Sequence, residues 1–370
     1  MSTGHHLFAP SSAHRWMKCA PSLAVTLVEG GTSSFEAAEG SVAHDMAGTC
    51  LQLSLDAHEV WQSVETASYD GHAVPISVEM RAYVQTYLDY VRALGGGLEV
   101  EQKIEFKPDP DFGGTADALV WDMESSTLHV IDFKYGKGIK VDSRNNAQMM
   151  CYALLALARG AVFDPVEVVL HIHQPRIDNI SKWALDTAEL VTFSGEVSKA
   201  ITRARIAIKR YDKGEEEFTA SDFTPGAHCK FCPRSGDCIG LQEQSILNAQ
   251  MVFGDISAVP KETLGAILAK ADLIDTWIAA VRKHAMDRAL LGETIDGYKL
   301  VQKRPMRRWV NAEVVERVAL DNLIEVHEKV LMTPPAVEKM FGSTKAFAVT
   351  FGYLVESVSS GLALVSADDK

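Results

Sequence analysis

The chain has 370 residues, of which 47% are hydrophobic and 23% charged, with six cysteines and a formal net charge of −13 at pH 7. This composition excludes disordered, collagen-like and small disulfide-stapled proteins, and it is typical of a globular protein of about two domains. No run approaches the roughly 20 apolar residues of a membrane span, and the N-terminus has no apolar stretch of signal-peptide length. We therefore expect a soluble protein of a reducing, cytoplasmic compartment without a membrane partner.

The negative charge is confined to one segment. Residues 29–122 hold 17 acidic and 4 basic residues, a balance of −13, whereas the rest of the chain holds 32 of each. Two later stretches, residues 199–213 and 299–309, are locally basic. The net charge by itself argues against a nucleic-acid partner, but its uneven distribution leaves that partner open.

The chain up to residue 213 predicts helices packed on a mixed sheet. Residues 33–55 indicate a helical region with a break at Gly40-Ser41, and residues 77–94 an amphipathic helix that stops at a triple glycine. The other expected helices cover residues 145–158 and 187–211, and the expected strands cover residues 98–106, 115–122, 127–133, 166–173 and 181–185, the first three forming a meander. This order indicates an α/β fold, with a mixed β-sheet flanked by helices.

A smaller C-terminal α+β region is expected beyond a cysteine-rich segment. Residues 261–291 and 311–340 favour helices, and residues 297–302 favour a strand.

Two carboxylates are expected to meet at one edge of the sheet. Asp117 lies early in one predicted strand and Asp132 near the end of the next, so antiparallel pairing would bring them together. Two convergent carboxylates suit Mg²⁺ or Mn²⁺, which prefer oxygen ligands. Lys134 points to the same strand face as Asp132, while Gln148 and Tyr152 share one face of the following helix.

Each of these residues taken singly also has a purely structural interpretation. Asp117 fits a turn, Asp132 and Lys134 fit a surface cross-strand pair, and Gln148 and Tyr152 fit an exposed helix face. Glu101 and Glu105 are candidates for extra acidic groups, although we favour solvated strand residues for both, and we interpret His171 and His173 as ordinary sheet residues. The combination of Asp117, Asp132, Lys134, Gln148 and Tyr152 in this order nevertheless favours a metal-phosphate site.

This ordered set resembles the PD-(D/E)XK nuclease superfamily, specifically its RecB-like branch. That branch has an upstream helical histidine, a G-x-x-D strand, a (D/E)-x-K strand and a Q-x-x-x-Y helix, and His44 in AAEGSVAH supplies the first motif. The resemblance implies a restriction-endonuclease-like core whose metal ion is held by His44, Asp117, Asp132 and the Phe133 carbonyl. It also implies that Lys134 positions the attacking water and that Gln148 and Tyr152 orient their helix against the DNA backbone. Many relatives have Glu at the position of Asp132, so the number of catalytic metal ions, one or two, stays open.

The cysteines form a second pattern. Cys229, Cys232 and Cys238 follow the spacing C-x-x-C-x5-C, which is typical of metal ligands. A fourth ligand would come from Cys19, Cys50, Cys151 or His228. Cys50 and Cys151 lie in apolar helices and fit core positions, whereas Cys19 lies in a loop-like segment.

An upstream cysteine combined with this downstream spacing resembles the 4Fe–4S clasp of RecB-like nucleases of the AddB type and of CRISPR-adaptation nucleases. The resemblance implies that Cys19, Cys229, Cys232 and Cys238 hold a cluster that joins the ends of a nuclease domain. Zinc is the alternative occupant. The expected domains are then residues 1–245 and a C-terminal region, residues 246–370.

The full layout, including SAHRWMKCAPS and GYKLVQKRPMRRW, also resembles a phage-borne family of RecB-like proteins catalogued as a domain of unknown function. The second of these segments suits either a strip that contacts the DNA backbone or a solvated basic hairpin. Its candidate nucleic-acid contacts are Lys299, Lys303, Arg304, Arg307, Arg308 and Trp309.

The sequence thus leads to the hypothesis of a Mg²⁺- or Mn²⁺-dependent DNA exonuclease in phage DNA processing or recombination, acting in the host-cell cytoplasm. DNA is the expected partner, with a recombinase or a single-strand-binding protein as candidate protein partners, and the oligomeric state is open. Two alternatives remain: a non-catalytic DNA-binding or assembly protein that keeps the nuclease fold, and a zinc-stapled scaffold.

Overall fold

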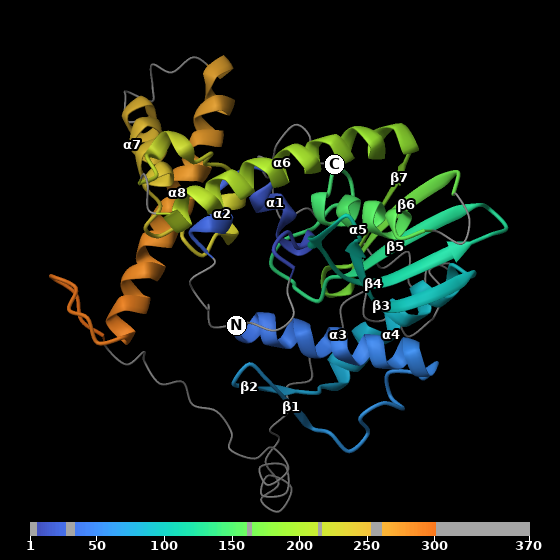
Figure 1. Ribbon diagram of the computed structural model, residues 1–370. Coiled ribbons are helices and arrows are strands. Elements are labelled where there is room, and N and C mark those ends of the chain that lie inside the picture. Colours follow the sequence, from blue (N-terminus) through green and yellow to red (C-terminus); the bar gives the residue numbers. More distant parts are fainter. Residues whose placement is uncertain (1–5, 27–33, 161–164, 214–216, 253–260, 301–370) are drawn as a thin grey trace, which may run out of the picture. The chain divides into compact units, whose positions relative to one another are not determined.

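The computed structural model describes residues 6–26, 34–160, 165–213, 217–252 and 261–300 (Figure 1). The chain divides into two compact units, Met1–Lys299 and Leu300–Lys370, and the described elements belong to the first. Residues 297–300 form no strand, so that part of the expected strand at 297–302 is wrong. The rest of that strand and the expected helix at 311–340 lie outside the described residues, and a domain boundary at residue 245 stays a prediction.

The described elements comprise strands, α-helices and short 3₁₀ helices. The strands are β1 (Thr66–Tyr69), β2 (His72–Pro75), β3 (Gly97–Phe106), β4 (Asp109–Asp122), β5 (Thr127–Phe133), β6 (Glu167–Gln174) and β7 (Asn179–Leu185). The α-helices are α1 (Ala13–Trp16), α2 (Pro21–Ala24), α3 (Phe35–Leu53), α4 (Val78–Ala93), α5 (Ala147–Ala158), α6 (Thr187–Lys213), α7 (Ile239–Val252) and α8 (Lys261–Leu290). The 3₁₀ helices are η1 (Pro10–Ser12), η2 (Pro175–Ile177), η3 (Ala220–Asp222) and η4 (Ala227–Phe231). Within this described part, every helix is too short or too polar to span a bilayer.

The main sheet has five strands in the order β3-β4-β5-β6-β7. All neighbours are antiparallel except β5 and β6, which are parallel and joined through α5. The expected meander and the mixed α/β class are therefore confirmed. Ala118 of β4 and Ile131 of β5 form the last pair between these strands, so Asp117 and Asp132 lie side by side where the β4–β5 pairing ends.

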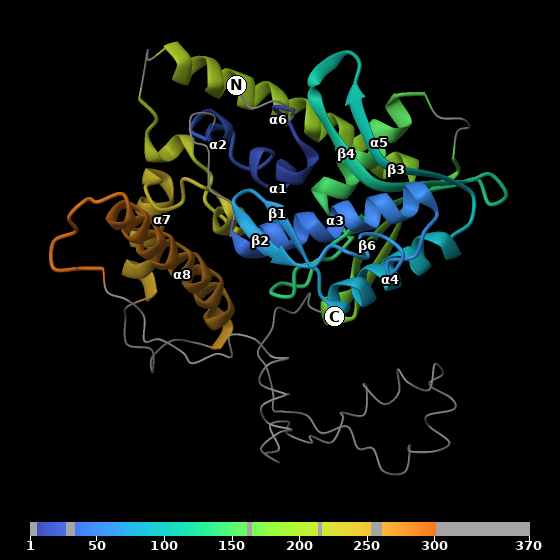
Figure 2. The same ribbon diagram turned by 90° about the horizontal axis from the view of Figure 1, so that it is seen from below.

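Helices cover both faces of this sheet (Figures 1 and 2). On one face, α3 and α4 pack on the sheet residues whose side chains face these helices, among them Val120 and Ile131. On the other face, α1, α5 and α6 pack on residues such as Leu119 and Val130. β5 is buried on both faces: six of its seven residues are buried, among them the apolar Leu128, Val130, Ile131 and Phe133.

Two local predictions are corrected by tertiary contacts. α3 runs without a break at Gly40-Ser41, because its buried face (Ala38, Val42) continues through that point and compensates for the weak helix propensity of glycine. β4 begins at Asp109 rather than at residue 115, because Gly113 and Gly114 pair with β3 instead of forming a turn. An added Cβ at Gly113 would lie 2.7 Å from the Ile104 carbonyl oxygen, so glycine permits this close pairing.

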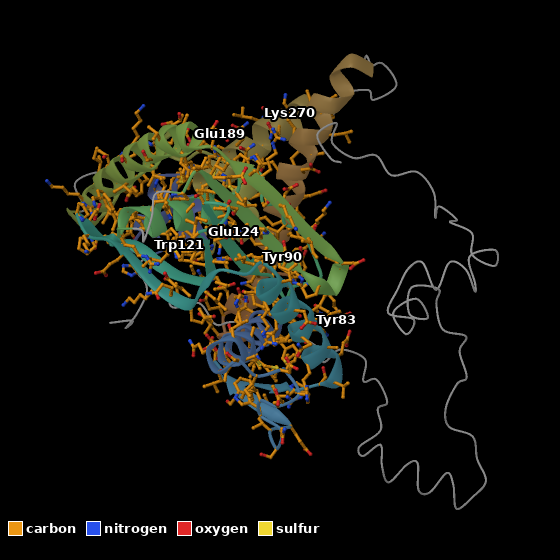
Figure 3. All side chains as sticks on the ribbon, turned by 90° about the vertical axis from the view of Figure 1, so that its right-hand side faces the viewer. Tyr83, Tyr90, Trp121, Glu124, Glu189 and Lys270 are labelled. Carbon is orange, nitrogen blue, oxygen red and sulfur yellow. The ribbon has the colours of Figure 1, made fainter. Side chains whose placement is uncertain are left out.

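Two neutral histidines are buried in β6, as expected for ordinary sheet residues. His171 Nδ1 lies 2.7 Å from the hydroxyl of Tyr90 on α4, and His171 Nε2 lies 3.0 Å from His129 Nδ1. Tyr90 is labelled in Figure 3. Burial, with His129 and Lys182, lowers the pKa of His171 to about 3, and burial lowers the pKa of His173 to about 4.

We expect the free energy of unfolding to fall as the pH drops from about 6.5 towards 4.5. In this range both histidines are protonated in the unfolded chain and neutral in the folded chain. Each histidine therefore lowers the free energy of unfolding by on the order of 2 kcal/mol at pH 4.5. His171→Gln should reduce the pH slope of the unfolding free energy, measured by urea titration, by about one proton. An unchanged slope would contradict the assignment of a neutral, buried His171.

Candidate metal centre

Three side chains from three elements converge around Asp117 in the middle of β4. His44 comes from α3, Glu101 from β3 and Asp117 from β4, and one ligand atom of each lies within 4.8 Å of the others. His44 Nδ1 lies 3.3 Å from Asp117 Oδ2, which also accepts a 2.8 Å hydrogen bond from the backbone N–H of Phe133. An imidazole and two carboxylates make a donor set for a divalent cation.

Glu101 is the residue of this group that the sequence analysis misjudged. Its side chain is half-buried beside Asp117 rather than solvated, whereas Glu105 on the same strand is exposed as expected. Space for Glu101 exists because residue 48 is glycine: a Cβ there would lie 2.8 Å from Glu101 Cγ. Gly48 follows His44 by one helical turn, so this spacing was the only signal in the sequence for the contact.

Asp132, Lys134 and Gln148 form a second, connected group at the end of β5. Asp132 is 3% exposed, and its Oδ2 lies 2.9 Å from Lys134 Nζ. Gln148 Nε2 donates to Asp132 Oδ1 at 2.8 Å, and Gln148 Oε1 accepts from Lys134 Nζ at 3.1 Å. Gln148 therefore fixes both charged groups, because its amide has a donor for the carboxylate and an acceptor for the ammonium.

The carboxylates lie close enough to disfavour one another's charge. Burial and then Asp117 raise the pKa of Glu101 to about 7, and burial also raises the pKa of Asp132, which Lys134 only partly offsets. Asp117 differs from these two carboxyls. Burial acts to raise the pKa of Asp117, but His44 and Lys134 hold it below its usual value. Burial likewise opposes protonation of His44, but Asp117 and Asp132 raise the pKa of His44 to about 9. A divalent cation would stabilise the charged forms of these carboxylates.

Aromatic residues surround the group. Tyr87 of α4 stacks on Phe133 at 4.5 Å between ring centroids, and its buried hydroxyl has no hydrogen-bond partner among the described residues. Burial first, then Asp117, Asp132 and Glu101, raises the pKa of Tyr87, so this hydroxyl lies near the carboxylates. Buried donors normally have a partner, and a water held by a cation between these carboxylates would supply one.

Tyr152 is buried on α5 rather than exposed. It contacts β4 at Gly114, where an added Cβ would lie 3.3 Å from Tyr152 Cε1 and 2.9 Å from Pro10 Cδ. The glycine of the G-x-x-D motif thus allows α5 and η1 to approach the strand that carries Asp117. The roles of Tyr152, Gln148 and the Phe133 carbonyl in binding DNA or metal stay predictions.

The four cysteines expected to hold a cluster line one narrow pocket. Cys19 follows α1, Cys229 lies in η4, Cys232 follows η4, and Cys238 precedes α7. All six cysteines of the chain are free thiols, and Cys50 and Cys151 lie in the two cores as expected. Among the described residues, His44, Glu101 and Asp117 alone form a group of three ligands within 4.8 Å, so no three of these sulfur atoms are that close together.

Backbone amides point at three of these thiols. The Gly226 N–H donates to Cys229 Sγ at 3.4 Å. Burial raises the pKa of Cys19 and of Cys238, but the amide of Thr224 opposes this at Cys19, and those of Gly240 and Leu241 oppose it at Cys238. Such amides stabilise thiolates, which is the form in which cysteine binds a metal.

The predicted basic strip is mostly outside the described residues. Lys299 is exposed. Its other members, Lys303, Arg304, Arg307, Arg308 and Trp309, lie beyond residue 300, and their role stays a prediction.

Comparisons with known proteins place the chain in a family. A solved structure described as "Crystal structure of SSO0001" is 14% identical, with a TM-score of 0.21, over 61% of this chain and 95% of that chain. Residues 5–370 match the family described as "Protein of unknown function (DUF2800)". Because this match covers nearly the whole chain, the protein belongs to the DUF2800 family.

Proposed function

We propose that this protein is a Mg²⁺- or Mn²⁺-dependent DNA nuclease of the RecB-like kind, acting as an exonuclease in phage DNA processing or recombination. The observation that carries the proposal is the placement of the His44, Glu101 and Asp117 group beside the Asp132, Lys134 and Gln148 group. One group suits a divalent cation and the other presents an ammonium. A phosphodiester bond needs both kinds of stabilisation during hydrolysis.

The residues present fit such an ion. His44, Glu101 and Asp117 would hold it, with Asp132 next to them. Burial first, and then Asp117, raises the pKa values of Glu101 and Asp132, and a bound cation would favour the charged forms of both carboxyls. When bound, the ion would activate a water molecule and polarise the scissile phosphate.

The chain's own residues supply the positioning. Asp132 and Gln148 hold Lys134 Nζ between them, so the ammonium keeps one position from which it donates hydrogen bonds to the attacking water or to a phosphate oxygen. Lys134 stays protonated: burial opposes this, but Asp132 raises the pKa of Lys134 above its usual value. It therefore acts as a donor and a positive charge rather than as a base.

We further propose that the cysteine pocket holds a 4Fe–4S cluster. Support comes from the four thiols that line one pocket and from the backbone amides that point at them. A tetrahedral zinc ion, with Zn–S bonds of about 2.3 Å, needs sulfur atoms about 3.8 Å apart. Since no three of the described sulfur atoms lie within 4.8 Å of one another, the spacing favours the larger cluster over zinc.

The proposed function is tested by a time course on end-labelled linear DNA and on covalently closed circular DNA. With Mg²⁺ or Mn²⁺ we expect short products from the linear DNA, no cleavage of the circle, and no activity in EDTA. Cleavage of the circle would instead indicate an endonuclease. If the fully metallated protein instead binds DNA in a salt-dependent manner and cleaves neither substrate, that result would overturn the proposed nuclease function and favour a non-catalytic DNA-binding protein.

Glu101→Gln is expected to raise the Mn²⁺ concentration needed for half-maximal cleavage about tenfold or more, because the variant loses one anionic ligand. Glu105→Gln, on the same strand but exposed, is the matched control and should behave as the unchanged protein. Gly48→Val should reproduce the Glu101→Gln effect, because its Cβ must displace the Glu101 side chain. An unchanged Mn²⁺ dependence in Glu101→Gln would remove Glu101 from the metal centre.

A further inference from the structure

The loop that joins β5 to α5 lies along the chain between Lys134 and Gln148, two residues of the proposed catalytic site. Residues 136–140, here called the lysine loop, begin two positions after Lys134 and precede the helix that carries Gln148. All five residues, Gly-Lys-Gly-Ile-Lys, are exposed, and Ile139 is 45% exposed although it is aliphatic. Exposed apolar and basic residues beside a reaction centre suggest contact with the substrate.

Two buried amide side chains hold this loop in one shape. Gln174, at the end of β6 and 2% exposed, donates from Nε2 to the carbonyl oxygens of Gly136 (2.7 Å) and Ile139 (2.8 Å). Its Oε1 accepts from the backbone N–H of Val141 at 3.1 Å, and Asn179 Nδ2 donates to the Val141 carbonyl at 2.8 Å. The loop is therefore preformed, so that a ligand need not order it.

The surface that the lysine loop presents is rich in donors. The backbone N–H groups of residues 136–140 have no acceptor among the described residues, and Lys137 and Lys140 form no ion pair with a described carboxylate. The nearest acid along the chain, Asp142, accepts hydrogen bonds at Oδ1 from the Arg144 N–H and the Ser181 hydroxyl. These two donors, and then Lys140, hold the pKa of Asp142 below its usual value, so Lys140 lies near this carboxylate without forming an ion pair with it. Consecutive free amides flanked by lysines are a typical environment for phosphate.

The two glycines of the loop point to a ligand as well. An added Cβ at Gly136 or Gly138 would meet nothing within 4 Å, and neither residue has a positive φ. Neither the packing nor the backbone conformation of the protein itself therefore requires glycine at these positions. Glycine does allow another backbone to approach closely, as a sugar-phosphate chain would.

We propose that the lysine loop binds the phosphate backbone of the DNA strand that is being cleaved, next to the scissile phosphate. This inference rests on the proposed nuclease function. Gly136 lies at most about 7 Å along the chain from Lys134, a span of about one to two nucleotides of one DNA strand. The loop amides and Lys137 and Lys140 thus contact phosphates one or two nucleotides from the reaction centre, and Ile139 contacts a sugar or base.

The test measures binding of fluorescein-labelled single-stranded and duplex oligonucleotides by fluorescence anisotropy, in EDTA and at several salt concentrations, with the full chain. For Lys137→Ala/Lys140→Ala we expect binding at least tenfold weaker and a slope of log K against log salt reduced by about 2. The control Lys199→Ala/Lys209→Ala removes the same charge from exposed positions on α6 and should leave the slope nearly unchanged.

A second variant tests the loop without changing its charge. Gly136→Ala/Gly138→Ala should melt at the same temperature as the unchanged protein but bind DNA several-fold more weakly, because the added methyl groups occupy space that only the ligand needs. Binding equal to that of the unchanged protein in both loop variants would overturn the proposal.

Failure of this inference is distinguishable from failure of the nuclease. If the unchanged protein cleaves DNA and the loop variants bind and cleave DNA equally well, the proposed role of the lysine loop is wrong and the proposed nuclease function is retained. If the loop variants bind weakly while the unchanged protein never cleaves, the loop stands as a strand-binding element and the nuclease is wrong. If the unchanged protein binds no DNA, both proposals fall.

Discussion

Asp132→Asn should abolish metal-dependent cleavage of linear DNA, by about a thousandfold or more, while the protein remains folded. The substitution keeps the shape of the side chain but removes the charge that holds Lys134 Nζ at 2.9 Å and lies beside the proposed metal ligands. Loss of a preorganised charge at a reacting phosphate is expected to cost this much. The measurement is the initial rate of product release from end-labelled DNA at saturating Mn²⁺.

The same substitution should leave the protein folded, because an asparagine at this position keeps a side-chain oxygen for the hydrogen bond from Gln148 Nε2, although Lys134 loses its charged partner. Urea unfolding and DNA binding in EDTA separate loss of activity from loss of structure. Glu105→Gln is the control for a change of charge at the same sheet. Full activity in Asp132→Asn would refute the assignment of the catalytic site.

If the cysteine pocket holds a 4Fe–4S cluster, the purified protein should be brown and contain iron, and Cys229→Ser should remove both and lower the stability by about 3 kcal/mol or more. The cluster would connect Cys19 to residues 229–238, and a cross-link across so long a segment restricts the unfolded chain strongly. Cys19→Ser should have the same effect, since both thiols line one pocket. Iron, sulfide and zinc analysis, visible absorbance and thermal melting provide the measurements.

Cys50→Ala and Cys151→Ala are the matched controls, because these two buried thiols lie in the cores away from the pocket. They should keep the colour and the iron content. A colourless protein with one zinc ion per chain would show that the cysteines bind zinc rather than an iron–sulfur cluster, and it would favour the zinc-stapled scaffold. A protein without any metal at these cysteines would contradict the clasp altogether.

Local sequence patterns predicted the elements whose residues carry their own signal. β5 occupies residues 127–133 as predicted, because an apolar, β-branched run follows a turn-forming segment. α4 and α5 fall within two residues of their predicted bounds, since both begin at polar capping residues, Ser77 and Asn146. The β1–β2 hairpin was missed, although Asp70-Gly71, both at positive φ, is a typical hairpin turn.

The sequence by itself determined which chemical groups the protein has and the elements on which they lie. His44, Asp117, Asp132, Lys134 and the cysteine spacing are local features, and the antiparallel pairing of β4 with β5 follows from a short turn. Contacts between distant segments were decided only by the tertiary structure. Glu101 joins His44 because Gly48 leaves room for it, and Gln174 shapes the lysine loop across more than thirty positions of the chain. Such contacts depend on how helices and strands pack, and neither charge nor periodicity along the chain specifies that packing.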